Sequence, residues 1–593
     1  MASSHTDRRR IGLDDPRVTT CYDRGDAFYS QDHPMTRPHN PSLHAADESN
    51  LTATMISELE ESQIAYPSDR HSSLYVPRER LKKIIDPERV LLLIKRLRSC
   101  QHMSPADQSR LRDNICYADG PCWRLLLILL YTGTEEELLN HIAEGVSDKC
   151  LPLSFGPEDD TSRPCGIKDH HHPTMGNWTR KNKREASQLS YAVKAVYFKH
   201  RPDGHVHYVL DSNDVLPIFK VKDIASSDAP KTQQKNAAEN DSASGGFGEV
   251  KKVEFETSHF NFGPLGVSHP KAPSQRPQFA LKTLISMSRD SFNKELASLL
   301  SFQDEKDKHL IRLLATFEVR TRQNGCESAT YHLLFPWAQG DLWHFWKLHE
   351  AEGARIPRCV WMAEQCYFVA RALMHVHKER GQLLRLSDID ENKHELFGRH
   401  GDVKADNILW FEGEDILVMT DFGLGRLHTK YSRSVVDPKL LDKSATYRAP
   451  EFDLRQGLIS RASDIFSLGC MYLEFVTWYL EGWDSVRELF PEQRIEEDVH
   501  KIESDTFFKI EDHKKDKERA VLKPKVRQWV KRLKQSSHSS KYIEQFLDLI
   551  ENHMLAPEPK NRIKSPKLVK ELEMLSIACR RDSSFYKPSV GRL

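Results

Sequence analysis

Residues 400–409 read "HGDVKADNIL". An acid, Asp402, stands five residues before an amide, Asn407, and Lys404 lies between them. A loop acid can orient a hydroxyl group and accept its proton, and an amide carbonyl is a hard oxygen ligand for Mg²⁺. The spacing therefore indicates chemistry on phosphate groups, in which a protein mainly positions the reactants and offsets their charge.

A second acid of the same kind follows in "VMTDFGLG" (residues 418–425). Asp421 can bridge a metal ion and a phosphate group, because Mg²⁺ prefers hard oxygen ligands. Taken singly, Asp402, Asn407 and Asp421 are equally consistent with ordinary loop acids and a turn amide. Their meaning depends on the other motifs of the chain.

Three motifs precede these acids. The glycines of "GGFGEV" (245–250) let backbone N–H groups approach phosphates, although a Gly pair alone is more often a turn. "QFALKTL" (278–284) predicts an apolar strand around Lys282, and "SFNKELASLL" (291–300) predicts a helix that carries Glu295. A Lys–Glu pair between them would direct the ammonium group at nucleotide phosphates. Three further motifs follow Asp421: "ATYRAPEF" (445–452), "SDIFSLG" (463–469) and "PEPKNR" (557–562).

This ordered set resembles the motifs of eukaryotic-type protein kinases. The resemblance covers residues 205–576 and is of the serine/threonine kind, because Lys404 stands where such kinases place a lysine. Fungal kinase-like proteins with a helical region before the kinase are also similar. The resemblance implies an α+β, bilobal fold with a small β-rich lobe and a large helical lobe.

The resemblance also implies roles for single residues. Asp402 would be the catalytic base and Lys404 would neutralise the γ-phosphate. Lys282 would contact the α- and β-phosphates and pair with Glu295. Mg²⁺ would be held by Asn407 and Asp421. Residues expected to bind ATP are Gly245, Gly246, Phe247, Gly248, Val250, Ala280, Lys282, Leu334, Phe335, Trp337, Asn407, Leu409 and Asp421.

Four more residues resemble supporting parts of the family. Glu451 and Arg562 would form a structural ion pair of the large lobe. Asp464 would brace the catalytic loop, and Ser444 would support the base. These are expectations carried over from the resemblance.

The sequence departs from the family pattern in several places. Gly401 replaces an arginine that binds a phosphorylated residue, so we expect the order of segment 424–448 to depend less on phosphorylation. Ala243 stands in place of the first glycine of the loop. The first strand comes either from "VLPIFKVK" (215–222) or the small lobe is irregular. No role is assigned to an insertion at 380–398.

The rest of the chain changes in composition along its length. Residues 1–75 are polar and predict a disordered tail, whereas residues 76–156 have helical apolar spacing. Residues 157–204 read as a polar linker and the start of a hairpin over 192–210, around a Pro-Asp-Gly turn. Residues 577–593 are expected to be a tail. We expect the helical region to offer a surface for a protein partner.

Bulk composition excludes little. Of 593 residues, 39% are hydrophobic, and Lys plus Arg equals Asp plus Glu, so charge indicates neither nucleic acid nor membrane as a partner. The apolar run "LLLILLY" (125–131) is too short to span a bilayer, and "MASSHTDRRR" lacks the apolar core of a secretory signal. Eleven cysteines without a CxxC pair predict reduced thiols in an intracellular protein, cytoplasmic or nuclear.

Two other functions compete with a protein kinase that uses ATP and Mg²⁺ on a protein substrate. A pseudokinase scaffold is favoured by Ala243 and the poor strand before it, and is opposed by the intact Lys282, Asp402, Asn407 and Asp421. A small-molecule phosphotransferase also uses an HGD sequence, but the "DFG" and "YRAPE" runs favour a protein substrate.

Overall fold

The structure is a computed structural model, in which the chain forms two compact units. One unit spans Pro16–Ser288 and Leu314–Pro336, and the other spans Arg289–Leu313 and Trp337–Leu593. The described residues are 18–21, 50–65, 74–117, 122–153, 155, 173–199, 201, 204–223, 248–262, 276–284, 288–303, 307–323, 326–349, 356–377, 399–421, 446–454, 459–497, 503–513 and 517–588.

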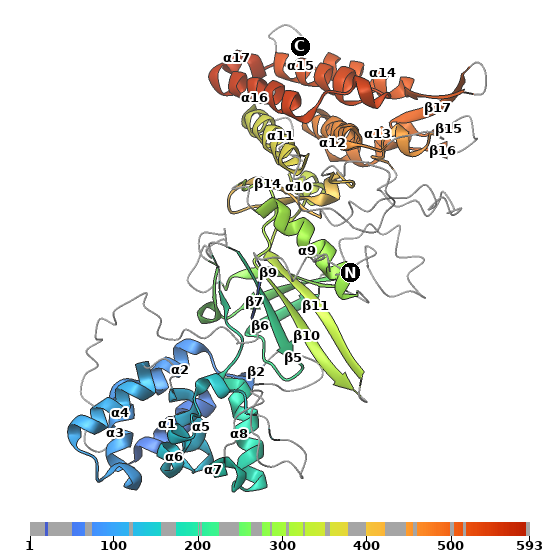
Figure 1. Cartoon of the computed structure of the whole chain (residues 1–593). Helices are drawn as coiled ribbons and strands as arrows, with labels where there is room; N and C mark the ends of the chain where they lie inside the picture. Colours follow the sequence, from blue (N-terminus) through green and yellow to red (C-terminus); the bar gives the residue numbers. More distant parts are fainter. Residues whose placement is uncertain are drawn as a thin grey trace, which may run out of the picture. The chain divides into compact units, whose positions relative to one another are not determined.

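The first unit contains a helical region, drawn in blue and teal in Figure 1. Its core is α5, which is apolar on all sides and buries every residue from Trp123 to Leu130, as expected for a helix surrounded by others. The elements are α1 (Leu51–Glu61), β2 (Ile64–Ala65), β3 (Leu74–Tyr75), α2 (Arg78–Ile84), α3 (Pro87–Arg96), η2 (Arg98–Cys100), α4 (Pro105–Tyr117), α5 (Trp123–Thr132), η3 (Glu135–Glu137), α6 (Leu138–Ala143), η4 (Asp148–Cys150), α7 (Pro173–Gly176) and α8 (Arg180–Val193).

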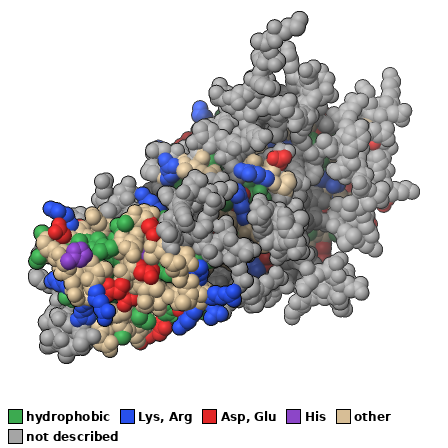
Figure 2. All heavy atoms as spheres, turned by 60° about the horizontal axis from the view of Figure 1, so that its bottom comes forward, with side chains coloured by type: hydrophobic (Ala, Val, Ile, Leu, Met, Phe, Trp, Pro, Cys, Tyr) green, Lys and Arg blue, Asp and Glu red, His purple; other side chains and the backbone are tan. Residues whose placement is uncertain are grey.

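Local capping fixes where these helices begin. Ser104 Oγ accepts the amide hydrogen of Asp107, and Pro105 occupies the first position of α4, where its missing N–H costs nothing. The buried carboxylate of Asp148 accepts the amide hydrogens of Arg124 and Leu125, so it satisfies the first turn of α5. The surface of the helical region mixes side chains of both charges (Figure 2).

The same unit contains a seven-stranded sheet in the order β1-β5-β10-β11-β9-β7-β6. Antiparallel pairs join β10, β11, β9, β7 and β6, whereas β5 pairs in parallel with β1 and with β10. A second small pair joins β4 to β8. The strands are β1 (Val18–Cys21), β4 (Phe198–Lys199), β5 (His205–Asp211), β6 (Ile218–Asp223), β7 (Gly248–Phe255), β8 (Phe260–Asn261), β9 (Gln278–Leu284), β10 (Ala315–Gln323) and β11 (Cys326–Pro336), with η6 (Thr257–His259) between β7 and β8.

The pairing within the sheet shows which segment supplies the strand before the glycine-rich stretch. β6, from the "VLPIFKVK" segment, pairs antiparallel with β7. The strand beside the glycine-rich stretch is therefore supplied from residues before the linker. This confirms one of the two alternatives left open by the sequence.

His259 joins the helical region to the sheet. Its Nε2 accepts the amide hydrogen of Arg78 at 3.0 Å, and its Nδ1 contacts the carbonyl oxygen of Val196 at 3.1 Å. The ring of Tyr75 lies edge-on to His259, and the guanidinium of Arg78 lies over Tyr197. These buried contacts therefore pack the helical region against η6, between β7 and β8.

The second unit is mostly helical; in Figure 1 its residues 289–303 are green and its later elements run from yellow to red. Its centre is α12, in which nearly every side chain from Ser463 to Leu480 is buried. Its elements are α9 (Arg289–Gln303), β12 (Gly340–Asp341), α10 (Leu342–Leu348), α11 (Ile356–His377), η8 (Ala405–Asn407), β13 (Ile408–Phe411), β14 (Ile416–Met419), η12 (Pro450–Phe452), α12 (Arg461–Glu481), η13 (Ser485–Leu489), α13 (Phe490–Arg494), β15 (Glu496–Glu497), β16 (Glu503–Ser504), β17 (Phe508–His513), β18 (Lys517–Leu522), α14 (Pro524–Gln535), α15 (Lys541–Leu549), η14 (Ile550–Met554), η15 (Pro559–Asn561), α16 (Ser565–Arg581) and α17 (Ser583–Tyr586).

The predicted α+β fold is confirmed: one unit holds the seven-stranded sheet, and the other is mostly helical. In the described part of the chain no helix combines the length and apolar character that crossing a bilayer requires.

Several predicted boundaries are wrong. The expected tail 1–75 contains α1, because an apolar stripe at Leu51, Met55 and Leu59 packs into the helical core. The expected linker 157–204 contains α7 and α8 for the same reason. The expected tail 577–593 holds the end of α16 and all of α17.

The predicted hairpin over 192–210 is also wrong. Among the described residues around the turn, Arg201 and Gly204 form an antiparallel bridge, and no longer ladder extends from it. β4 pairs with β8 instead, and β5 pairs with β1 and β10. Pairing with a wide sheet therefore overrides the local turn signal.

Candidate active site

Asp402 and Asn407 interact directly in the catalytic loop. The amide nitrogen of Asn407 donates to the backbone oxygen of Asp402 at 2.7 Å and to its carboxylate Oδ2 at 3.0 Å. The ammonium of Lys404 lies 3.0 Å from the same Oδ2. The structure thus brings together the three residues that the opening motif predicts.

A short hairpin carries Asp421 to this loop. β13 pairs antiparallel with β14, so the residue before β13 lies opposite the residue after β14. The amide of Thr420 donates to the backbone oxygen of Asn407 at 3.0 Å. Asp421 follows directly and has a left-handed φ of 61°, which a non-glycine residue rarely adopts and which is common at functional sites.

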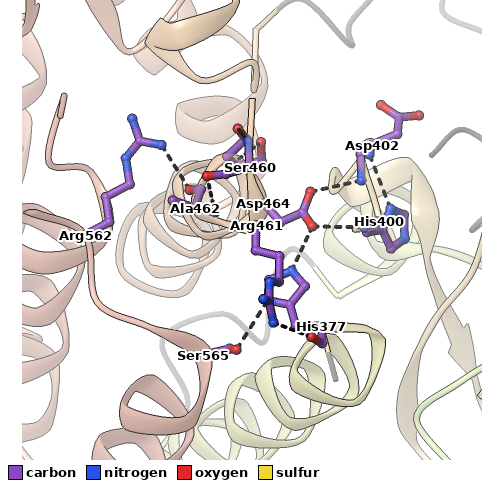
Figure 3. Close-up of polar contacts among 12 residues, drawn as sticks. His377, His400, Asp402, Ser460, Arg461, Ala462, Asp464, Arg562 and Ser565 are labelled. Carbon is purple, nitrogen blue, oxygen red and sulfur yellow. Dashed lines mark hydrogen bonds and ion pairs between the residues drawn. The ribbon is translucent and has the colours of Figure 1, made fainter. Parts of the chain in front are cut away.

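Asp464 braces the loop from α12, as Figure 3 shows. Its carboxylate accepts the amide hydrogens of His400 and Gly401, both at 2.9 Å. It also lies 2.8 Å from Nε2 of His377 at the end of α11. Burial opposes the ionisation of Asp464, but the contacts with His377, His400 and Gly401 hold its pKa below the ordinary value.

His400 connects this brace to Thr420, the residue before Asp421. Its Nε2 contacts the backbone oxygen of Thr420 at 2.9 Å, and its Nδ1 accepts the amide hydrogen of Asp402 at 3.3 Å. His400 is fully buried. One imidazole therefore fixes the backbone at Asp402, the predicted base, and next to Asp421, the predicted metal ligand.

Gly401 has a φ of 84°. A side chain at this position is strained, because a Cβ disfavours the left-handed region. The glycine that replaces the family's arginine therefore suits the backbone that Asp464 holds in place.

The predicted ion pair of the large lobe is present. Two nitrogens of Arg562 donate to the two carboxylate oxygens of Glu451, each at 2.7 Å, and both side chains are buried. Ser463 Oγ donates to Glu451 Oε1 at 2.6 Å. Ser444, the predicted support of the base, lies outside the described residues.

The sheet carries a second part of the predicted site on one face. The register places Val250 opposite Lys282, and Phe335 opposite Ala280. Because alternate residues of a strand share a face, Val250, Ala280, Lys282 and Phe335 lie on the same side. Leu334 pairs with Leu281 and is buried in the core of the other face, so the register separates it from these residues.

The remaining predicted residues are placed as follows. Gly245, Gly246 and Phe247 lie outside the described residues, whereas Gly248 begins β7. Glu295 is half-buried on α9, in a different compact unit from Lys282, so their ion pair stays a prediction. Trp337 and Leu409 are half-buried in the helical unit.

The residues of the loop fit Mg²⁺. The nitrogen of the Asn407 amide is committed to Asp402, so the ligand it offers a metal ion is its carbonyl oxygen. With the Asp421 carboxylate this makes a set of hard oxygen donors, and Mg²⁺ commonly takes one or two protein ligands together with phosphates. The described residues hold no cluster of three or more His, Cys, Asp or Glu suited to a metal ion.

Sequence reasoning missed His377 and Thr420. His377 ends the largely apolar helix α11, and a buried polar group there needs a partner, which is Asp464. That need was the only available signal. Thr420 acts through its backbone, which no side-chain motif could indicate.

Comparison with known proteins agrees with this geometry. The family described as "Protein kinase domain" matches residues 267–572, which is more than half of the chain. Cyclin-dependent kinase 8 of Drosophila melanogaster is 25% identical over 299 residues, or 49% of this chain and 59% of the relative. A putative G-type lectin S-receptor-like serine/threonine-protein kinase of Arabidopsis thaliana is 26% identical over 265 residues, or 44% of this chain and 25% of the relative.

The chain therefore spans less than two thirds of the length of either relative. The matched range includes Lys282, the whole catalytic loop, Asp421 and the Glu451–Arg562 pair. On the basis of this match and the geometry of the loop, the chain belongs to the protein kinase family.

Proposed function

We propose that this chain is a serine/threonine protein kinase that transfers the γ-phosphoryl group of ATP to hydroxyl groups of proteins, in the cytoplasm or nucleus. One observation carries the proposal. Asn407 contacts Asp402 through its side chain and Thr420, the residue before Asp421, through its backbone, so one residue links the two segments that carry the acids. Such a convergence has a clear purpose in holding a metal–phosphate group beside a base.

Each residue of the loop has a distinct role. Asp402 accepts a hydrogen bond from the substrate hydroxyl, orients it and takes its proton as the new P–O bond forms. The bond from the γ-phosphorus to the bridging oxygen breaks, and ADP leaves. The Lys404 ammonium, 3.0 Å from the Asp402 carboxylate, offsets negative charge on the transferred group. Asn407 keeps the carboxylate of Asp402 in place by donating to it.

Mg²⁺ would be held by Asn407 and Asp421, and when bound it neutralises charge on the phosphate oxygens. The brace from Asp464 keeps the backbone of the loop in one conformation, which reduces the rearrangement needed during the reaction. Lys282, Val250, Ala280 and Phe335 would bind the nucleotide through their shared face of the sheet. Leu334 lies on the opposite face, so its side chain is not expected to contact the nucleotide.

Two observations favour a protein substrate over a small molecule. The "YRAPE" segment is present, and its Glu451 is buried against Arg562. The curated relatives are named as kinases, one of them explicitly as serine/threonine. We therefore expect the chain to phosphorylate serine and threonine in peptides and not tyrosine.

The test is phosphate transfer from ATP with Mg²⁺ into separate Ser/Thr and Tyr peptide libraries. The native chain is compared with Asp402→Asn and with Asp548→Asn, an exposed acid on α15 in the same unit. Transfer into Ser/Thr peptides that Asp402→Asn abolishes and Asp548→Asn leaves unchanged supports the proposal. Labelling of tyrosine alone, or equal labelling by Asp402→Asn, overturns it.

The pseudokinase alternative retains one argument, Ala243 in the glycine-rich stretch. Its other argument, a missing first strand, is removed because β6 supplies that strand. A pseudokinase would bind ATP or a partner without turnover. Tight ATP binding with no transfer to any peptide or to the chain itself would favour it.

A further inference from the structure

The segment Thr446–Leu454 lies beside the catalytic loop. The guanidinium of Arg399, the residue before His400, lies over the ring of Phe452, 5.9 Å from its centroid. Under the proposed function, we expect a protein substrate bound at Asp402 to contact this segment. What holds the segment in place therefore bears on substrate binding.

Tyr447 is fixed to α12 at both ends of the residue. Its hydroxyl donates to Glu474 Oε2 at 2.5 Å, and its backbone oxygen accepts from Ser467 Oγ at 2.7 Å. Ser467 and Glu474 are seven residues apart, so they lie two turns apart on one face of the helix. Tyr447 therefore follows the rigid central helix of the unit.

Arg494 holds the other side of the Glu474 carboxylate. Its Nη2 lies 3.3 Å from Glu474 Oε1, and both side chains are only 1% exposed. The guanidinium lies over the rings of Phe490 and Phe507, at 4.2 and 4.3 Å from their centroids. This packing restricts the guanidinium of Arg494 to one orientation.

A second path leads from Arg494 to the neighbouring residue of the segment. Nε of Arg494 donates to the backbone oxygen of Asp505 at 2.9 Å. Both carboxylate oxygens of Asp505 lie within 2.9 Å of the Thr446 hydroxyl, which donates to them. Buried Lys523 donates to the backbone oxygens of Arg494 and Ser504 and fixes this bend of the chain.

We propose that Arg494 is a positioning residue that orders Thr446 and Tyr447 through Asp505 and Glu474, so that this substrate-facing segment does not need a phosphate group to be held. The link to substrate binding rests on the proposed function. The proposal also accounts for Gly401, because a kinase whose segment is ordered by its own buried guanidinium does not require an arginine in the catalytic loop to bind a phosphate.

Arg494→Met is a usable variant for electrostatic reasons. Burial raises the pKa of Glu474 to about 7, against the attraction of Arg494. Without the guanidinium, Glu474 takes up a proton instead of remaining as a stranded charge. Arg494→Lys keeps the charge but cannot reach both Glu474 and Asp505 as a planar fork does.

The first experiment is hydrogen exchange of the full chain over residues 446–454, which needs neither ATP nor activity. Arg494→Met is expected to speed exchange there roughly ten- to a hundredfold, the loss of one charge-assisted hydrogen bond, with α16 unchanged. Arg494→Lys is expected to fall in between. The matched control is Arg532→Met, which removes a surface pair with Glu481 on the same helix α12 and should change nothing in the segment.

A second variant tests the proposal even if Arg494→Met unfolds the chain. Tyr447→Phe deletes only the hydroxyl that meets Glu474 and is expected to loosen the same segment. If Arg494→Met loses protection throughout the chain, Tyr447→Phe decides. Phosphatase treatment of the native chain is expected to leave exchange in the segment unchanged.

Activity gives an independent readout. The KM for a peptide substrate is expected to rise at least about threefold in Arg494→Met and to recover partly in Arg494→Lys, while the KM for ATP stays constant. Unchanged exchange over 446–454 in both Arg494→Met and Tyr447→Phe overturns the proposal, as does loosening of the segment by phosphatase. If the chain transfers no phosphate, only the proposed function is contradicted, because the hydrogen-exchange result does not depend on activity.

Discussion

Asn407 donates both hydrogens of its side-chain amide to Asp402, one to the backbone oxygen and one to the carboxylate. The pair closes the catalytic loop on itself and directs the carboxylate of the proposed base. It also leaves the Asn407 carbonyl as the ligand for a metal ion. Under the proposed function, this one side chain would position both the base and the metal ion.

Asn407→Asp should be more damaging than the change of one atom suggests. It removes the donors and sets a second negative charge about 3.0 Å from Asp402 Oδ2. We expect kcat to fall by roughly 10²–10³, comparable with the loss of a key catalytic donor. Steady-state kinetics with saturating Mg²⁺ measures this. The exposed Asn561→Asp is the control and should keep native kcat.

Gly401→Ala should destabilise the chain. The left-handed φ costs about 1–2 kcal/mol once a Cβ is present, which thermal unfolding can detect. Gly145→Ala, at a φ of 76° in the helical region, is the matched control. Both should lower stability, but only Gly401→Ala should lower activity. Equal activity in the two variants would show that the backbone at Gly401 has no catalytic importance.

Phosphatase treatment should leave the activity of the native chain largely unchanged. Gly401 provides no guanidinium that could bind a phosphate group. Under our proposal, Arg494 of the second unit orders residues 446–454 instead. Peptide phosphorylation before and after treatment measures this. A collapse of activity, restored by rephosphorylation, would contradict the account.

The brace at Asp464 should make stability depend on pH. Its pKa is lowered in the folded chain, so its contribution is present above the unfolded value of about 4 and is lost as the pH falls through the lower folded value. Asp464→Asn removes that contribution. Urea unfolding should show a gap between native and variant at pH 7 that narrows below about pH 4. A gap that is constant with pH would mean that the ionised carboxylate is not the source.

The Glu451–Arg562 pair should behave as a buried unit. Arg562→Met strands a carboxylate that is 1% exposed and is expected to cost about 3–5 kcal/mol of unfolding free energy. The double variant Glu451→Gln with Arg562→Met should recover part of that loss, because no unpaired charge remains. Chemical denaturation measures both. Additive losses would contradict the coupling.

The contacts among Asp402, Lys404 and Asn407 could be predicted from the sequence, because the proposed chemistry restricts the residue types in the loop. A base, a neutralising ammonium and oxygen ligands leave few choices at positions 402, 404, 407 and 421. The Glu451–Arg562 pair and the brace at Asp464 were likewise predicted through the family resemblance. The structure brings these groups together as the motif order implied.

Tertiary contacts of residues outside the family motifs could not be predicted. His377 meets Asp464 only because the end of α11 reaches α12, and Arg494 reaches Glu474 only through the bend fixed by Lys523. No local pattern encodes such distances. The hairpin expected over 192–210 failed for a related reason, since β5 gains more partners in the wide sheet than a local turn offers.

The central claim is that Asp402 and Asp421 act at one metal–nucleotide centre in different roles. The most direct measurement is Mg²⁺-dependent ATP binding by calorimetry, alongside phosphate transfer, for the native chain, Asp402→Asn and Asp421→Ala. We predict that Asp402→Asn still binds ATP with Mg²⁺ but transfers no phosphate, whereas Asp421→Ala loses the Mg²⁺ dependence of binding and also transfer. Native binding and native transfer in Asp421→Ala would contradict the account.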